Sequence, residues 1–173
     1  IIKPTSGKVF YNGQDITSFS VDQRANIGFS YAFQQPVRFK GIKIKKLFEI
    51  VGNGSVVDSC EYLSKVGLCA REYIDRCFDD KLSGGEAKRI ELALSLARGA
   101  ELNLFDEPEA GIDLWSFEAL LDIFKNLNKT SIIVSHQEKI MELANCVVLM
   151  DSGKVVKTGS VKEIKLEKCR RLS

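Results

Sequence analysis

The chain has 173 residues, of which 45% are hydrophobic and 28% are charged, and its formal net charge is +2. This length and hydrophobic content allow one globular domain with a buried core and exclude a disordered chain. No hydrophobic run approaches the roughly 18 residues that span a bilayer, and the first residues lack the pattern of a signal peptide, so we expect a cytoplasmic protein without membrane insertion. The small net charge gives no strong indication of nucleic-acid or membrane binding.

The first part of the chain predicts short elements. Residues 1–13 indicate a turn, a strand and a second turn at Asn12-Gly13, and residues 20–26 indicate a short helix. Residues 27–33 form a hydrophobic, strand-like run that ends at Gln34. Taken alone, an amide at the end of a strand is just as often an ordinary surface residue.

A helical segment follows. Residues 43–51 and 56–66 predict two helices, with a Gly-Asn-Gly break between them. A run of basic residues precedes Glu49 without an intervening acid: Arg38, Lys40, Lys43, Lys45 and Lys46. Such a run is usually a solvated helix face, and aromatic residues are sparse within it, so we expect no direct nucleic-acid binding.

The clearest helix begins after Leu82 and ends before Gly99. Ser83 is a suitable N-cap, and Glu86 lies three residues further on, as in a capping box. A small polar residue and two glycines at a helix start leave backbone N–H groups unpaired, which suits a phosphate. The later positions divide into a hydrophobic face and a polar face: Ala87, Ile90, Leu94 and Ala97 against Lys88, Arg89 and Glu91.

Two strand-like runs end in chemically active side chains. The run that begins at Leu102 ends in the adjacent carboxylates Asp106 and Glu107, the pattern of a buried strand that delivers acids to the edge of a sheet. Such a pair suits a metal ion and a water molecule. The run from 130 to 134 leads to Ser135 and His136, expected at the same edge. Each feature also has an ordinary explanation, as a turn after a strand or a structural histidine.

The remaining features are structural. Asp113 is well placed to cap the helix that follows it, and residues 146–150 and 154–157 predict a hairpin around Ser152-Gly153. The tail from 161 to 173 is basic and is expected to be frayed. The five cysteines show neither a Cys-x-x-Cys pair nor zinc or cluster spacing, so reduced structural thiols are expected.

Five motifs in order make the chain similar to one family, the ABC (ATP-binding cassette) ATPases. Residues 33–36 (Phe-Gln-Gln-Pro) resemble the Q-loop, and residues 82–86 (Leu-Ser-Gly-Gly-Glu) resemble the signature motif. Residues 102–107 resemble the Walker B strand with its catalytic glutamate. Residues 110–113 resemble the D-loop, and residues 131–136 resemble the strand that carries the switch histidine.

This resemblance implies an α/β fold of the P-loop NTPase type, with a mainly parallel sheet flanked by helices and a helical signature subdomain. The catalytic core would comprise residues 1–34 and 98–160, the helical subdomain about 35–97, and the basic tail 161–173. No Gly-x-x-x-x-Gly-Lys-[Ser/Thr] phosphate loop (Walker A) occurs in the sequence. We therefore expect a fold that is incomplete at the N-terminus, and ATP hydrolysis by the complete protein.

The resemblance also implies roles for the residues at the strand ends, with ATP and Mg²⁺ as cofactors. Asp106 would hold Mg²⁺ through water, and Gln34 would contact both Mg²⁺ and the attacking water. Glu107 would orient or deprotonate that water, and His136 would hydrogen-bond the γ-phosphate. These few groups suffice if a P-loop is supplied, because phosphoryl transfer needs positioning and charge neutralisation more than covalent chemistry.

A second group of residues would act across a dimer. By resemblance, the signature motif caps the nucleotide that is bound to the opposite subunit, and the D-loop also acts across the interface. ATP would then close a head-to-tail dimer. The nucleotide-binding residues implied in this way are Ser83, Gly84, Gly85, Glu86 and Asp113.

The partner depends on the branch of the family. Residues 32–37, Glu86 and residues 106–113 are similar to those of SufC-type ATPases, which implies Suf iron–sulfur cluster assembly and soluble scaffold partners. One alternative is the ATP-binding subunit of a membrane transporter, peripheral at the membrane, where Gln is typical at the position of Glu86. Another is a non-catalytic fragment, because the P-loop is absent. A chromosome-maintenance ATPase is disfavoured because no heptad coiled coil separates Gln34 from Leu82.

Overall fold

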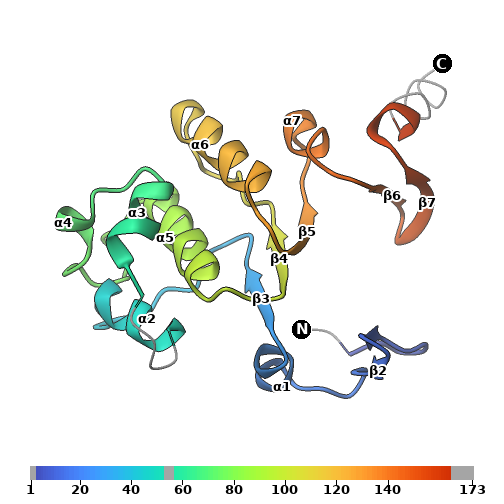
Figure 1. The fold of residues 1–173 in the computed structure, drawn as a ribbon, viewed down its shortest axis with the longest axis horizontal. Coiled ribbons are helices and arrows are strands. Elements are labelled where there is room, and N and C mark those ends of the chain that lie inside the picture. Colours follow the sequence, from blue (N-terminus) through green and yellow to red (C-terminus); the bar gives the residue numbers. More distant parts are fainter. Residues whose placement is uncertain (1–2, 53–56, 165–173) are drawn as a thin grey trace.

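The computed structural model describes residues 3–52 and 57–164, and it shows a central parallel sheet with helices packed against it (Figure 1). The sheet contains β3 (Phe29–Ala32), β4 (Leu102–Asp106) and β5 (Thr130–Val134) in the order β3-β4-β5. Ala32 pairs with Phe105 and Asp106 pairs with Val134, so the three strands end at nearly the same level. The segments that follow the strands therefore meet at one edge of the sheet.

The predicted strand, the turn at Asn12-Gly13 and the short helix are confirmed, while residues 1 and 2 lie outside the described residues. The strands β1 (Phe10–Tyr11) and β2 (Gln14–Asp15) form an antiparallel hairpin, and Asn12 and Gly13 in its turn both have positive φ values, 47° and 80°. Two positive φ values in succession are characteristic of the type I′ turn that Asn-Gly favours. Helix α1 (Val21–Asn26) starts with a capping box, in which the Ser20 side chain accepts from the Gln23 N–H.

A helical region lies on one side of the sheet (Figure 1). Its helices are α2 (Ile44–Val51), α3 (Ser59–Lys65), α4 (Ala70–Tyr73) and α5 (Gly84–Ala97). The one-turn helix α4 was not predicted; it is too short to produce a hydrophobic repeat. All four helices lie in the segment from 35 to 97, and its division from the core as a subdomain stays a prediction.

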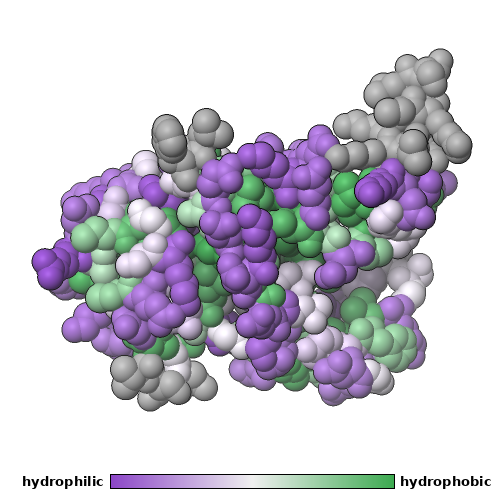
Figure 2. All heavy atoms as spheres, turned by 45° about the horizontal axis from the view of Figure 1, so that its top comes forward, coloured by the Kyte–Doolittle hydropathy of each residue, from purple (hydrophilic) through white to green (hydrophobic). Residues whose placement is uncertain are grey.

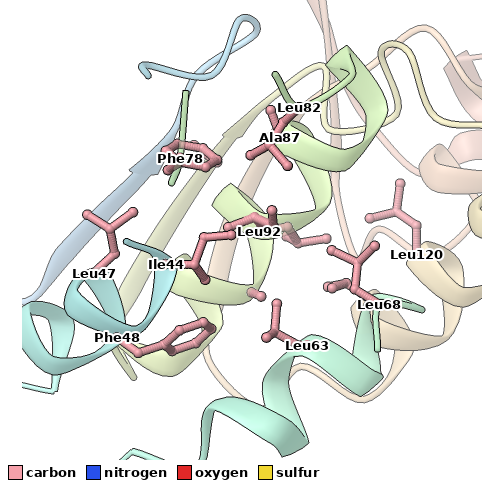
Figure 3. Packing of buried hydrophobic residues seen from close by; sticks show 14 of the residues in the cluster. Ile44, Leu47, Phe48, Leu63, Leu68, Phe78, Leu82, Ala87, Leu92 and Leu120 are labelled. Carbon is pink, nitrogen blue, oxygen red and sulfur yellow. The ribbon is translucent and has the colours of Figure 1, made fainter. Parts of the chain in front are cut away.

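Helix α5 occupies the centre of the hydrophobic core. Figure 3 shows Ala87 and Leu92 of α5 among Ile44 of α2, Leu63 of α3 and Leu120. The same cluster includes side chains of β3 and β4, so it continues from the helical region into the sheet. Because α5 is covered by α2, α3 and β3, it is buried on more sides than an amphipathic surface helix.

The polar face that the sequence indicated for α5 is largely covered as well. Of its residues, the Lys88 side chain is only 2% exposed and that of Glu91 only 14%. Arg89 is half-buried. A periodic pattern identifies the helix correctly, but it cannot show that a second layer covers the polar side as well.

The predicted C-terminal helix and hairpin are present. Asp113 caps α6 (Leu114–Lys125) by accepting from the Ser116 N–H, and α7 (Glu138–Met141), a one-turn helix that was not predicted, follows β5. An antiparallel hairpin joins β6 (Val147–Asp151) and β7 (Lys154–Gly159). The predicted tail, residues 161–173, is described only to residue 164; the rest lies outside the described residues.

The surface mixes hydrophilic and hydrophobic areas on the face that Figure 2 shows. Hydrophobic side chains that are more than half exposed occur on the last three strands: Ile132, Val134, Val148, Met150 and Val155. Among the described residues, no helix is both long enough and apolar enough to cross a membrane.

Candidate active site

Glu107 is the meeting point of the three strand ends. It follows β4 directly, while Gln34 follows β3 and His136 follows β5. The Gln34 amide Nε2 donates a hydrogen bond to Glu107 Oε2 at 2.6 Å. His136 Nε2 lies 3.3 Å from Glu107 Oε1. The structure thus brings together the three residues for which catalytic roles were predicted.

The backbone holds Glu107 in an uncommon conformation. Its φ angle is +43°, in the left-handed region, which costs a residue with a side chain on the order of 1–3 kcal/mol. Its N–H donates to the Val134 carbonyl oxygen at 2.9 Å and so extends the pairing between β4 and β5 by one bond. Strain of this kind persists where surrounding contacts enforce it, and it is frequent at functional sites.

The site is open to solvent. The His136 side chain is 84% exposed and that of Glu107 is 26% exposed, so a ligand at the sheet edge can reach both. Asp106 lies beside them, and its Oδ2 accepts a hydrogen bond from the Tyr31 hydroxyl at 3.1 Å. Partial burial and this bond to Asp106 raise the pKa of the Tyr31 phenol, which favours its role as a donor.

Lys88 forms hydrogen bonds to the backbone at the ends of β3 and β4, a role that the sequence did not suggest. Its Nζ donates to the backbone carbonyl oxygens of Phe33, Gln34 (3.5 Å) and Asp106 (3.2 Å). One buried ammonium group therefore joins α5 to the ends of β3 and β4. Burial lowers the pKa of Lys88, and the nearby Glu91 opposes that shift.

Glu91 is the ion-pair partner of Lys88. The Lys88 Nζ lies 3.6 Å from Glu91 Oε2, and Glu91 Oε1 accepts from the Phe33 N–H at 3.2 Å. Burial raises the pKa of the Glu91 carboxyl, while the Lys88 charge lowers it. Each charge is thus costly alone and is tolerated because the other is present.

The start of α5, where the sequence predicted an anion site, has the hydrogen bonds of a capping box. The Ser83 side chain accepts from the Glu86 N–H at 3.2 Å, and Glu86 Oε2 accepts from the Ser83 N–H at 2.7 Å. Glu86 Oε1 accepts from the Tyr73 hydroxyl at 2.6 Å and lies 3.4 Å from Arg76. These hydrogen bonds lower the pKa of Glu86 to about 2; the bond from Tyr73 has the largest effect and the bond from the Ser83 N–H the next largest. Both Glu86 oxygens are therefore engaged within the chain, whereas Ser83 and Gly84 are exposed.

The signature segment and the D-loop segment lie close together where Gly85 faces the backbone of Gly111. A Cβ added to Gly85 would lie 2.7 Å from the Gly111 carbonyl oxygen, so only glycine fits without movement. Asp113 is committed to its capping role, accepting from the Ser116 N–H at 3.0 Å and from its hydroxyl at 2.8 Å. Arg89 donates to the same Ser116 hydroxyl at 3.2 Å and ties α5 to α6.

The predicted residues therefore form two groups. Gln34 and His136 each contact Glu107, and among the described residues no hydrogen bond or ion pair joins these three to Ser83, Glu86 or Asp113. A surface cavity of about 290 Å³ belongs to neither group. It lies at the opposite ends of β3 and β4, where its lining includes Gly28 and Glu101.

Comparison with known proteins identifies the family. Residues 1–110 match the ABC transporter family. An uncharacterized ABC transporter ATP-binding protein of Methanocaldococcus jannaschii is 36% identical over 94% of this chain and 69% of its own length. The chain belongs to the ABC transporter family. Its similarity therefore extends well beyond the short motifs.

The relatives belong to different branches. The iron–sulfur cluster assembly protein SufC of Plasmodium berghei is 30% identical over 91% of this chain and 48% of its own length. The sulfate/thiosulfate import ATP-binding protein CysA of Neisseria meningitidis is 33% identical over 91% of this chain and 47% of its own. The chain thus spans about half the length of these two curated relatives.

Solved structures confirm the predicted α/β fold. A dimeric ATP-binding cassette in a post-hydrolysis state, bound to ADP and Pi, superposes with a TM-score of 0.80 at 20% identity and covers 92% of this chain and 75% of that one. A bacterial Atm1-family ABC exporter with ATP bound gives a TM-score of 0.82 at 19% identity, with 98% and 33% covered. At this identity the similarity establishes the fold alone.

Proposed function

We propose that the complete protein is an ABC ATPase that hydrolyses ATP with Glu107 as the residue that orients or deprotonates the attacking water. The observation that carries this proposal is the convergence of Gln34 and His136 on Glu107 at one sheet edge. A carboxylate held on both sides by polar groups, and still open to solvent, suits a general base. Membership of the family supplies the substrate class.

The donor groups at the sheet edge fit a hydrated magnesium ion. Mg²⁺ prefers oxygen ligands and keeps several waters, so one or two carboxylates suffice. Asp106 supplies a carboxylate, and Gln34 uses its amide nitrogen on Glu107, which leaves its amide oxygen available. When bound, Mg²⁺ would neutralise charge on the phosphates. In this proposal Asp106 holds the ion through water and Gln34 contacts both ion and water.

His136 would donate to the γ-phosphate of ATP. Its side chain is 84% exposed, so the imidazole can reach a ligand without a change in the backbone. A donor that is already in place stabilises charge on the transferred phosphoryl group without reorganisation. The contact with Glu107 is one restraint on where that donor lies.

We propose that the second group acts on the nucleotide of an opposite subunit. Ser83, Gly84 and Gly85 present the N-terminus of the 14-residue helix α5, where free N–H groups and the helix dipole favour phosphate. Glu86 keeps this loop in shape through the capping box, and Asp113, at the end of the D-loop, caps α6. ATP would then close a head-to-tail dimer that contains two such sites.

Within the family, we favour Suf-type iron–sulfur cluster assembly in the cytoplasm as the driven process. The similarity of residues 32–37 and of Glu86 to SufC-type ATPases supports this, as does the SufC relative. The similarity to CysA supports the alternative, a transporter subunit that docks a membrane domain. The tagged complete protein, purified from its native host, should retain soluble scaffold proteins; retention of a polytopic membrane protein would favour the transporter.

Phosphate release from ATP tests the activity itself. The complete protein should release phosphate in the presence of Mg²⁺, and the His136→Ala variant should be slower by on the order of 100-fold because a transition-state donor is lost. A complete protein that binds ATP but releases no phosphate would refute the proposed reaction.

A further inference from the structure

Glu109 lies next to the site, and the proposed mechanism gives it no role. Glu109 follows Glu107 by two residues, and its Oε1 accepts from the Ser135 hydroxyl at 2.6 Å. The same oxygen accepts from the backbone N–H of His136 at 3.4 Å. Glu109 therefore contacts the segment that carries the imidazole, but not the imidazole itself.

Packing alone does not explain the Glu109 carboxylate. Its other oxygen, Oε2, is buried and has no hydrogen-bond partner among the described residues. Burying such an oxygen unpaired costs stability, so a hydrocarbon side chain would serve packing better. The nearby ammonium of Lys88 offsets part of this cost, because the charge of Glu109 opposes the lowering of the Lys88 pKa.

Three contacts connect the segment after β4 with the segment after β5. The Glu107 N–H bonds to the Val134 carbonyl, Glu109 bonds to Ser135 and His136, and the His136 imidazole returns to Glu107. Since the His136 side chain is 84% exposed, little packing restrains it. The bonds from Glu109 to its backbone are therefore a main restraint on where the imidazole lies.

We propose that Glu109 is a positioning residue for catalysis, which holds the Ser135–His136 segment so that the imidazole stays against Glu107. This inference rests on the proposed ATPase function. It assigns to Glu109 an effect on the rate of the chemical step rather than on nucleotide affinity. A displacement of about 1 Å at a reacting group can reduce a rate by on the order of 100-fold.

The first test follows His136 directly by NMR in the complete protein. The imidazole Cε1–H resonance is identified as the one that disappears in the His136→Ala variant. It should move in Glu109→Ala and remain near its original position in Glu109→Gln, which keeps an acceptor oxygen for Ser135 and His136. Glu49→Gln is the control, because Glu49 lies on α2 in an exposed pair with Lys46 and should leave the resonance unchanged.

The second test is kinetic. Glu109→Ala should lower kcat on the order of 10-fold, with KM for ATP changed by less than about twofold. In the His136→Ala background, the same substitution should change kcat by less than about twofold, because its effect passes through His136. If Glu109→Ala fails to fold, Glu109→Asp replaces it, since the shorter side chain withdraws the same oxygen.

Two results would overturn the proposal: an unmoved His136 resonance in Glu109→Ala, or a loss of kcat that persists in full without His136. Failure of the proposed function would look different. If the parent protein hydrolyses no ATP, that function is wrong, while the NMR comparison still decides whether Glu109 positions His136.

Discussion

Gln34 and Glu107, 73 positions apart in the chain, share a hydrogen bond of 2.6 Å from amide nitrogen to carboxylate oxygen. This bond connects the segment after β3 with the carboxylate after β4. It can form because the two strands are paired neighbours that end at the same level. Together with the contacts of Lys88 to the backbone of Gln34 and Asp106, this bond links the Q-loop to the proposed catalytic carboxylate.

The substitution Gln34→Ala should lower kcat of the complete protein by on the order of 10-fold, because Glu107 loses its amide donor and Mg²⁺ loses an oxygen. Gln35→Ala is the matched control, since Gln35 is the exposed neighbour in the same loop. Steady-state phosphate release measures both variants. Equal rates for the two variants would remove Gln34 from the mechanism.

Lys88→Met should destabilise the fold by about 3–5 kcal/mol, because it leaves the Glu91 carboxylate buried without its cation. The double variant Lys88→Met, Glu91→Leu should recover part of this loss. Urea unfolding gives the free energies, and Lys125→Met, in an exposed pair with Asp122, should change stability by less than about 1 kcal/mol. A Lys88→Met variant as stable as the parent would show that the buried pair is not required.

The strands and the helix that carry the candidate site could be predicted because the sequence patterns that indicate them are local. Strand runs that end in Gln34, Glu107 and His136, and a helix with a capping box at Ser83, can each be recognised within a few residues. Parallel strands then bring their ends together by topology alone. The meeting of the strand ends could therefore be predicted from these local signals, whereas the fold class was predicted from the resemblance to the ABC ATPases.

The missed residues depend on packing between distant segments. Lys88 was assigned only to the polar face of its helix, because helical periodicity identifies that face and does not show what covers it. Tyr31 binds Asp106 across β3 and β4, and Glu109 binds a loop 26 positions away. No local pattern encodes such pairs, so the supporting contacts of the site could be found only in three dimensions.

Gly85→Ala should destabilise the fold by about 1–3 kcal/mol, because the new Cβ would meet the Gly111 carbonyl oxygen at 2.7 Å. Gly84→Ala is the matched control: a Cβ there meets nothing within 4 Å. Thermal unfolding of the two variants should therefore separate them clearly. Equal melting temperatures would mean that the signature and D-loop segments can move apart without cost.

Glu86→Gln should make the fold about 1–2 kcal/mol less stable at neutral pH, because a charged acceptor for Tyr73 and Arg76 is lost. The pKa of Glu86 is lowered from 4.5 to about 2 in the fold. Its contribution is therefore complete above pH 4.5 and disappears as the pH falls toward 2.

The difference between parent and Glu86→Gln should shrink over that pH range in urea titrations. Glu118→Gln, which removes a carboxylate from an exposed pair with Lys139, is the control and should lose less than about 1 kcal/mol. A difference that does not depend on pH would mean that Glu86 stabilises the loop without its charge.

The most direct test of the account is the oligomeric state of the complete protein carrying Glu107→Gln, measured by light scattering with ATP and Mg²⁺. Glutamine retains the size of the side chain but cannot accept a proton, so ATP should bind and remain intact. We predict a stable dimer with ATP that is absent with ADP, together with a loss of phosphate release of at least about 100-fold. Unimpaired turnover by Glu107→Gln would contradict the assignment of Glu107 and with it the proposed mechanism.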